Sequence, residues 1–160
     1  MSAPTPLTPA DIEIATRAAD DFTRIYYSAY DSKSRLTELP KLYRPTSALT
    51  WNGTPFQGQD GLINLVTNMP PTKHEIQSFD CHPIPGTSPP SLLIIVSGNV
   101  THGLGPAGNP AGSSSKNKEG HPRVFSQTFV LIPDASAPPP TKAGALAKYF
   151  ISADAMRFVG

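Results

Sequence analysis

The chain has 160 residues, of which 38% are hydrophobic and 16% charged, and its formal net charge is +1. This length suits a single domain with its own core, and so small a charge argues against electrostatic binding of nucleic acid or an anionic membrane. Residues 1–8 lack the basic and apolar runs of a signal peptide, and no stretch approaches the roughly 18 apolar residues of a membrane helix, so we expect a soluble, intracellular protein with a disordered N-terminus over residues 1–8.

The first predicted helix has a clear start signal. Thr8 can act as N-cap, Pro9 occupies the first helical position, and Asp11 stands where the acid of a capping box belongs. The helix should end at Asp31-Ser32. Apolar residues recur along it at spacings of three and four, which predicts that one stripe is buried. The stripe comprises Ile12, Ala15, Ala19, Phe22, Ile25, Tyr26 and Ala29.

A hairpin is predicted between two shorter helices. Residues 46–51 form a strand pattern, and Asn52-Gly53 is favoured in a two-residue turn because both positions must tolerate positive φ. Pro55 in the returning strand has no N–H to donate and should lie at a sheet edge. Before the hairpin, the sequence predicts a helix over residues 34–43, which Pro40 can interrupt. After it, Asp60 begins a third helix.

The second half of the chain is strand-like. Four strands are predicted, over residues 73–82, 91–102, 124–132 and 148–159. Because no helix separates them, successive strands should pair antiparallel. The fold class is therefore α+β, with three N-terminal helices packed on a curved antiparallel sheet in one domain over residues 9–160. Residues 103–122 and 133–145 are rich in Gly, Ser and Pro and predict mobile loops.

The apolar run in the second of these strands predicts a binding partner. Leu92 to Val96 is apolar at five consecutive positions, and alternation makes both faces of the sheet hydrophobic there. The helices can cover only one face, and an exposed apolar face usually marks an interaction site. We therefore expect a sheet-face dimer that buries on the order of 1,600 Å². Arg157 in the last strand should find a carboxylate, within the chain or across this interface.

Three other patterns have competing interpretations. Residues 103–108 match the letters of a dinucleotide fingerprint, but a Ser-rich loop follows where a helix is required. Trp51 is either a core residue or part of an aromatic pocket, with Met156 and Phe158, that receives a partner's side chain. The potential metal ligands lack close ligand spacing and fit surface or strand-end positions better. They are His74, His82, His102, His121 and Cys81.

An acid/base set is the remaining candidate. Tyr30-Asp31, Asp80 and Asp154 could meet in a cavity between helix and sheet. Caps and loop-facing carboxylates explain these residues equally well, because no nucleophile-base or paired-acid spacing is present. The sequence alone leaves both interpretations open.

Seven short stretches together resemble the nuclear transport factor 2-like family, from about Asp11 to Val159. They are Ala18 to Tyr27, Leu42-Tyr43, Leu49 to Gly53, Phe56 to Gly58, Met69-Pro70, Phe125 to Phe129 and Asp154 to Phe158. The resemblance implies a curved, cone-shaped sheet wrapped against three helices and dimerisation through the open sheet face. It implies no cofactor, no metal and no catalytic residue.

Within this family the residues favour the export branch. The import carrier, a homodimer that binds Ran-GDP, has acids after the tryptophan and in the loop after the long strand, where this chain has Asn52 and the uncharged run 103–115. Residues 51–53, 80–83 and 97–100 instead resemble the small cofactor of the nuclear mRNA export receptor. That resemblance implies a heterodimer with the receptor's own domain of this fold, help in docking nucleoporin Phe-Gly repeats, and shuttling between nucleus, nuclear pore and cytoplasm.

The resemblance also implies a partner interface centred on Arg157, which matches a family arginine that pairs with a partner aspartate. The other residues placed in this interface are Phe125, Gln127, Phe129, Ile95 and Ser97. The import carrier is the first alternative function. A small dehydratase or isomerase of the same fold is the second, and it would need ionisable residues that converge inside the cone.

Overall fold

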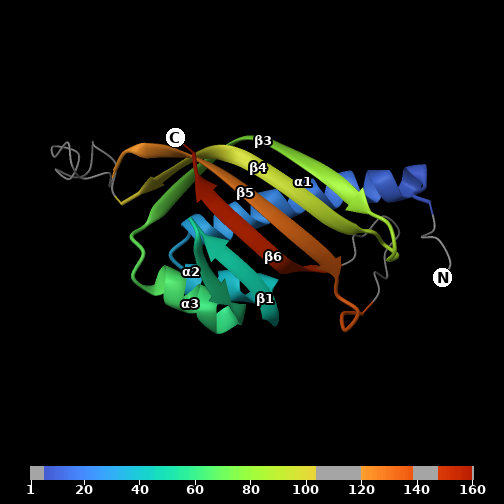
Figure 1. Ribbon diagram of the computed structural model, residues 1–160, viewed down its shortest axis with the longest axis horizontal. Helices are drawn as coiled ribbons and strands as arrows, with labels where there is room; N and C mark the ends of the chain where they lie inside the picture. Colours follow the sequence, from blue (N-terminus) through green and yellow to red (C-terminus); the bar gives the residue numbers. More distant parts are fainter. Residues whose placement is uncertain (1–5, 104–119, 139–147, 160) are drawn as a thin grey trace.

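The computed structural model describes residues 6–103, 120–138 and 148–159, which form one six-stranded sheet and helices packed on it (Figure 1). The strand order is β2-β1-β6-β5-β4-β3. In chain order the elements are α1 (Pro9–Asp31), α2 (Arg35–Glu38), the 3-10 turn η1 (Leu39–Leu42), β1 (Tyr43–Trp51), β2 (Thr54–Gln57), α3 (Gly58–Thr67), β3 (Thr72–Ile84), β4 (Ser91–His102), β5 (Pro122–Pro133) and β6 (Tyr149–Phe158). None of the described helices has both the length and the apolar character needed to cross a membrane.

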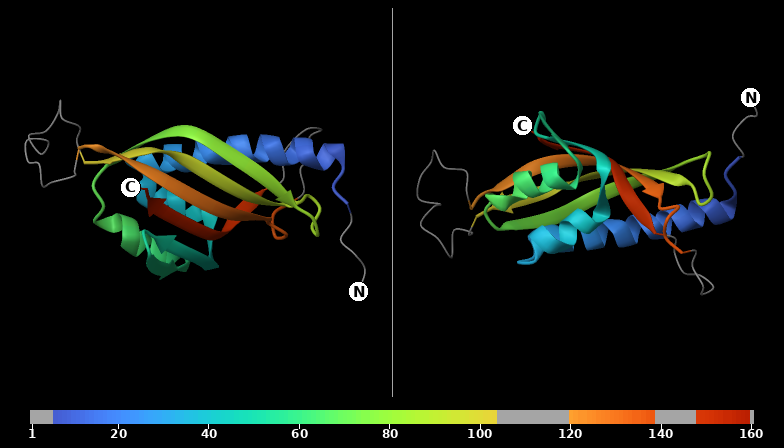
Figure 2. Two further views of the ribbon diagram at one scale, coloured as in Figure 1. Left: turned by 45° about the horizontal axis from the view of Figure 1, so that its top comes forward. Right: turned by 90° about the horizontal axis from the view of Figure 1, so that it is seen from below.

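The helices lie on one side of the sheet, and the opposite side of β3 to β6 is uncovered (Figure 2). The predicted α+β fold class is therefore confirmed. The four strands β3 to β6 pair antiparallel with their neighbours in sequence, as expected. One pairing differs from the prediction, because β1 runs parallel to β6. These two strands are far apart in the sequence and are not joined by a short turn, so nothing in their connection requires them to pair antiparallel.

Helix α1 begins as predicted. The Thr8 hydroxyl accepts a hydrogen bond from the Asp11 amide at 3.1 Å, and the Asp11 carboxylate accepts one from the Thr8 amide at 2.9 Å. The predicted buried stripe is partly wrong, because Ile12 and Ile25 are each 51% exposed. Tyrosines take the inward positions instead, since their hydroxyls find hydrogen-bond partners inside the cone. The buried residues are Ala15, Ala18, Ala19, Thr23, Tyr26, Tyr27 and Tyr30.

The hairpin and the shorter helices follow the predicted chemistry. Asn52 and Gly53 both have positive φ, at 46° and 90°, and β2 with Pro55 forms one edge of the sheet. The second helix divides into α2 and η1, with Pro40 near the start of the 3-10 turn. Residues 104–119 and 139–147, which make up most of the two predicted loops, lie outside the described residues, as do residues 1–5 of the predicted disordered N-terminus.

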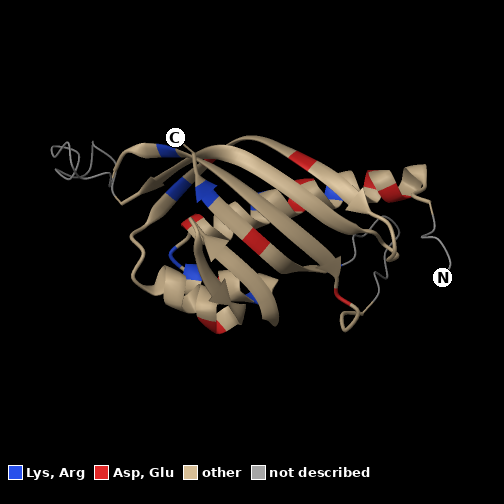
Figure 3. Ribbon diagram, viewed as in Figure 1, with Lys and Arg blue, Asp and Glu red and all other residues tan. Residues whose placement is uncertain are grey.

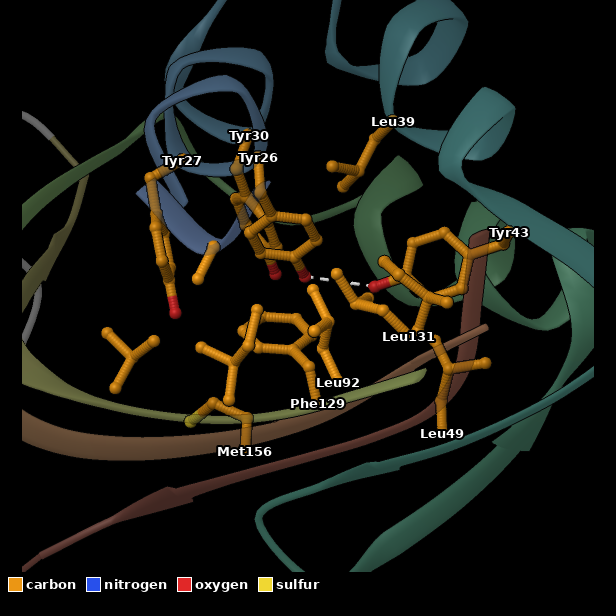
Figure 4. Close-up of a cluster of buried hydrophobic side chains, with 14 of the residues drawn as sticks. Tyr26, Tyr27, Tyr30, Leu39, Tyr43, Leu49, Leu92, Phe129, Leu131 and Met156 are labelled. Atoms are coloured by element: carbon orange, nitrogen blue, oxygen red, sulfur yellow. Dashed lines mark hydrogen bonds between the residues drawn. The ribbon is translucent and has the colours of Figure 1, made fainter. Parts of the chain in front are cut away.

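The apolar run in β4 divides between two faces, as expected. Leu92, Ile94 and Val96 are fully buried beneath the helices, whereas Leu93 is half-buried and Ile95 is 38% exposed on the other side. Figure 4 shows the inward side chains, where Leu92, Phe129 and Leu131 rise from the sheet toward tyrosines of α1. The core therefore occupies the concave side of the sheet and leaves a second apolar surface outside it.

Gly98 in β4 allows the backbones of β3 and β4 to approach closely. A Cβ atom at this position would overlap the Glu75 carbonyl oxygen and lie 3.1 Å from the Cα of Ile76. We expect Gly98→Ala to lower the free energy of unfolding by about 2 kcal/mol or more, because backbone atoms cannot move aside as side chains do. Urea denaturation measures this change.

Ser97→Ala is the matched control for this variant. Its side chain lies on the uncovered face and is only partly buried, so the loss should stay below about 1 kcal/mol. Equal stability of Gly98→Ala and Ser97→Ala would contradict the tight strand contact.

Candidate functional site

The uncovered side of the sheet is the largest candidate site. We call it the open face and define it by side chains that alternate with the buried ones. Strand register places Ile95 on β4, Thr128 on β5 and Ala155 on β6 in one row across this face. Its other central members are Leu93, Ser97, Ser126, Val130, Ala153 and Arg157.

Charge is scarce on the centre of the open face. Strand β4 carries no Lys, Arg, Asp or Glu, and β5 carries only Arg123 (Figure 3). Depletion of charge with retained apolar side chains is typical of the centre of protein interfaces. Arg157 is the exception on β6, because it is exposed and makes no ion pair or hydrogen bond within the described residues. Of the two predicted positions for a carboxylate partner of Arg157, the one within the chain is not occupied among the described residues, and the one across an interface stays a prediction.

Half of the predicted interface residues lie on the wrong side of the sheet. Phe125, Gln127 and Phe129 are 1%, 3% and 0% exposed and belong to the core. The prediction of these three as interface residues is wrong, because side chains one position apart on a strand point to opposite faces. Ile95, Ser97 and Arg157 do share the open face. Their contact with a partner stays a prediction.

The proposed aromatic pocket is assembled but nearly full. The Trp51 and Phe158 rings meet edge to face with centroids 5.4 Å apart, and the Arg123 guanidinium lies 3.6 Å from the Phe158 centroid. Trp51 and Met156 line a cavity of about 20 Å³. This is room for roughly one water molecule, so an aromatic side chain does not fit in this conformation.

A second candidate site is a buried polar group inside the cone, which we call the cone cluster: Tyr26, Tyr27, Tyr43, Gln127 and Asp154. The Tyr43 hydroxyl donates to Asp154 Oδ2 at 2.6 Å, and Gln127 Nε2 donates to Asp154 Oδ1 at 2.7 Å. Tyr27 donates to Gln127 Oε1 at 2.8 Å. The Tyr26 and Tyr43 hydroxyl oxygens are 2.9 Å apart, as the dashed line in Figure 4 shows. Among the described residues no buried side-chain nitrogen or oxygen lacks a hydrogen-bond partner.

Burial controls the ionisation of the cone cluster. Desolvation raises the pKa of Asp154 to about 6, and hydrogen bonds from Gln127, Tyr43 and Tyr26 oppose this rise. Desolvation also raises the pKa of the Tyr26, Tyr27 and Tyr43 hydroxyls well above 10, and the nearby Asp154 carboxyl adds to each shift. The tyrosines therefore stay protonated and can donate to the acid.

The cone cluster bears on the acid/base prediction. Tyr30 and Asp154 do line one cavity, whereas Asp80 lies on an exposed part of β3. Asp31 is held by His74 Nδ1 at 2.6 Å and by the Thr72 hydroxyl at 2.7 Å. The cavity of about 20 Å³ is far smaller than the roughly 300 to 1,000 Å³ of small-molecule sites. The acids converge only in part, and no space for a substrate accompanies them.

Sequence reasoning missed most of the cone cluster. The apolar pattern of the sequence accounts only for the ring of Tyr26, and the predicted partner interface puts Gln127 on the opposite face of the sheet. The available signal was the position of tyrosines on the inner side of a core helix, since a buried tyrosine hydroxyl needs a hydrogen-bond partner. The hydrogen-bond partners of these tyrosine hydroxyls lie on β1, β5 and β6, and only the folded sheet brings these strands together.

The potential metal ligands are scattered. No group of three or more His, Cys, Asp or Glu residues in the described ranges could hold a metal ion. Burial lowers the pKa of His102 to about 4, so this ring is neutral at pH 7, and burial raises the pKa of the Cys81 thiol to about 11. His82 and His121 are exposed. Of the predicted dinucleotide fingerprint only Gly103 is described, and residues 104–108 lie outside the described part.

Comparisons with known proteins agree with this architecture. A family model of the nuclear transport factor 2 (NTF2) domain matches residues 18–107. NTF2-related export protein 1 of Bos taurus is 33% identical over 125 residues, which cover 76% of this chain and 77% of that protein. Nuclear transport factor 2 of Kluyveromyces lactis is 30% identical over 121 residues, which cover 74% of this chain and 82% of that protein.

Solved structures share the fold at lower identity. Nuclear transport factor 2 of Cryptosporidium parvum aligns with a TM-score of 0.65 at 26% identity, over 96% of this chain and 98% of that one. A chain of the Chaetomium thermophilum complex between the Mex67 NTF2-like domain and Mtr2 gives 0.62 at 19% identity, over 91% and 99%. A protein of Novosphingobium aromaticivorans assigned as a scytalone dehydratase gives 0.69 at 9% identity, over 96% and 89%.

The raised pKa of Asp154 predicts how stability depends on pH. Folding moves this pKa from 3.8 to about 6, so between these values the folded chain keeps a proton that the unfolded chain loses. Its stabilising effect is complete below about pH 4 and is lost as pH rises through 6. Relative to Asp154→Asn, the free energy of unfolding of wild type should fall by about 2 kcal/mol between pH 4 and pH 7.

Urea denaturation at a series of pH values measures this difference. Asp134→Asn is the control of opposite sign, because hydrogen bonds from Ser136 and Arg44 lower the pKa of Asp134 to about 2. The contribution of ionised Asp134 to the free energy of unfolding is present above about pH 4 and is lost as pH falls. A difference between wild type and Asp154→Asn that does not vary with pH would contradict the buried acid.

Proposed function

The chain belongs to the nuclear transport factor 2 family, and we propose that it acts there as the non-catalytic small subunit of the heterodimeric nuclear mRNA export receptor. The open face carries the proposal. This surface is apolar along β4 and β5, holds almost no charge at its centre, and presents the exposed Arg157 at one side.

The size of the open face suits a stable complex. Four strands about 4.8 Å apart and roughly 10 residues long, at about 3.3 Å per residue, cover on the order of 600 Å². A typical specific interface buries roughly 800 Å² on each partner. The open face with the rim of its strands can supply that area, and Leu93, Ile95 and Val130 supply apolar contact.

The partner is the receptor's own domain of the same fold. Relatives of this chain are named export proteins, and a solved complex of this fold joins Mtr2 to the NTF2-like domain of Mex67. Such a partner offers a second sheet face, and two sheets that pack face to face bury their apolar side chains together. Pairing would stabilise the receptor's domain and help the complex dock nucleoporin Phe-Gly repeats while it shuttles between nucleus and cytoplasm.

The homodimeric import carrier for Ran-GDP is the second candidate, favoured by the 30% identity to nuclear transport factor 2 of Kluyveromyces lactis. Its acidic residue after the tryptophan is replaced by Asn52, whose side-chain oxygen accepts a hydrogen bond from the Phe158 amide at 3.3 Å. Asn52 therefore closes the end of the sheet and adds no negative charge for a basic GTPase surface. An enzyme of this fold would need a larger cavity than the cone provides.

Charge reversal at Arg157 tests the heterodimer. The chain is mixed with the receptor's NTF2-like domain, and the molar mass of the mixture is measured by light scattering. Wild type should form a one-to-one complex. Arg157→Asp should weaken it by a factor on the order of 100 or more, because a carboxylate would then face the partner's acid.

Lys33→Asp is the control, because Lys33 is exposed in the turn after α1, on the helical side of the chain. This variant should bind like wild type. A stable wild-type homodimer that ignores the receptor's domain would contradict the proposal and favour the import carrier, which a Ran-GDP binding assay would then examine.

A further inference from the structure

The tip of the hairpin between β1 and β2 carries a reactive pair of residues in an exposed position. Asn52 precedes Gly53, and both residues are exposed. Among the described residues Asn52 is the only one other than glycine with positive φ. A Cβ atom built on Gly53 would meet no atom within 4 Å apart from its chain neighbours. Neither a side chain nor another strand therefore shields the backbone at this turn.

The two ends of the Asn52 amide have different surroundings. Its Oδ1 accepts a hydrogen bond from the Phe158 amide at 3.3 Å, whereas its Nδ2 makes no hydrogen bond within the described residues. The Gly53 amide makes none there either. A donor at Oδ1 stabilises the negative charge that develops on this oxygen when a nucleophile attacks Cγ. The groups that would react are thus free, and the oxygen that gains charge has a donor.

The chemistry available to this pair is ring closure. The Gly53 nitrogen, once a base has taken its proton, can form a bond with Asn52 Cγ, because a five-membered imide results. The Cγ–Nδ2 bond breaks, and ammonia leaves with a proton from water. One water molecule then opens the imide, which gives aspartate or isoaspartate. The net reaction exchanges ammonia for water and transfers no electrons. Glycine favours it because no side chain obstructs the attack.

We propose that Asn52 is a site of spontaneous deamidation, with the Gly53 amide as nucleophile and water as co-reactant. The inference does not rest on the proposed function. Isoaspartate lengthens the main chain by one atom in a turn whose length is fixed by the strands on either side. The Asn52 amide donates to the Met156 carbonyl at 2.7 Å, so the modified turn loses contacts with Met156 and Phe158, which flank Arg157 in β6.

The chain contains its own comparison sites. Asn64 in α3 and Asn68 directly after this helix are exposed as well, but Leu65 and Met69 follow them. The side chains of these following residues obstruct attack by their amides. Exposure alone therefore does not distinguish Asn52, whereas the glycine after it does.

Incubation of the full chain at pH 7 and pH 9, followed by peptide mass spectrometry, tests the site. Asn52 should deamidate at least about tenfold faster than Asn64 and Asn68. It should yield both aspartate and isoaspartate, and it should react faster at pH 9 because the nitrogen must lose a proton. Gly53→Ala should slow the reaction by about tenfold or more.

Gly86→Ala is the matched control for Gly53→Ala. Gly86 is also an exposed turn glycine with positive φ and no atom near a Cβ at its position, but no asparagine precedes it. This variant should leave the rate at Asn52 unchanged. Thermal unfolding of both variants shows whether they are folded at the temperature of incubation.

Three results would overturn the inference. The first is a rate at Asn52 no higher than that at Asn64. The second is aspartate without isoaspartate, because water would then attack the side chain directly. The third is an equal rate in folded Gly53→Ala and Gly86→Ala. The first two are measured on wild type, so they decide the matter even where Gly53→Ala fails to fold.

Discussion

A strand turns successive side chains to opposite faces, and in β6 this constraint separates a buried acid from an exposed base. Asp154 and Met156 point into the cone, whereas Ala155 and Arg157 point to the open face. The same alternation on β4 divides Ile94 from Ile95. A single sheet therefore carries a core on one side and an uncovered, partly apolar surface on the other, and helices on one side suffice to complete the fold.

The contents of the cone leave little room for a substrate. Tyr26, Tyr27 and Tyr43 converge on Gln127 and Asp154, and each polar atom of this group is hydrogen-bonded. The space that a substrate would need is filled by aromatic rings. A fully satisfied polar network in a dry interior is rigid, so the cone cluster holds β5 and β6 firmly and keeps Arg157 and its neighbours in register on the outer surface.

Local signals in the sequence predicted local structure well. The capping box at Thr8, the turn at Asn52 and the bounds of β4 depend on neighbours in the chain, and the structure confirms them. The predictions of which face is buried were wrong where both faces of a strand or helix carry apolar side chains, because the sequence does not show which face turns inward. Phe125 and Phe129 looked like interface residues, yet their strand presents Ser126 and Thr128 outward. Ile25 looked like a core residue, yet Tyr26 and Tyr27 took the inward positions because their hydroxyls reach partners on distant strands.

The sequence by itself determined the three helices, the order of the strands along the chain, the α+β class and the excess of apolar residues on β4. These properties follow from the periodicity of side chains and from turn chemistry, which act over a few residues. Only the tertiary structure decided the parallel pairing of β1 with β6, the convergence of the cone cluster and the position of Ser126 beside Arg157. Each depends on contacts between residues 17 to 128 positions apart, whose geometry is set by packing across the whole sheet.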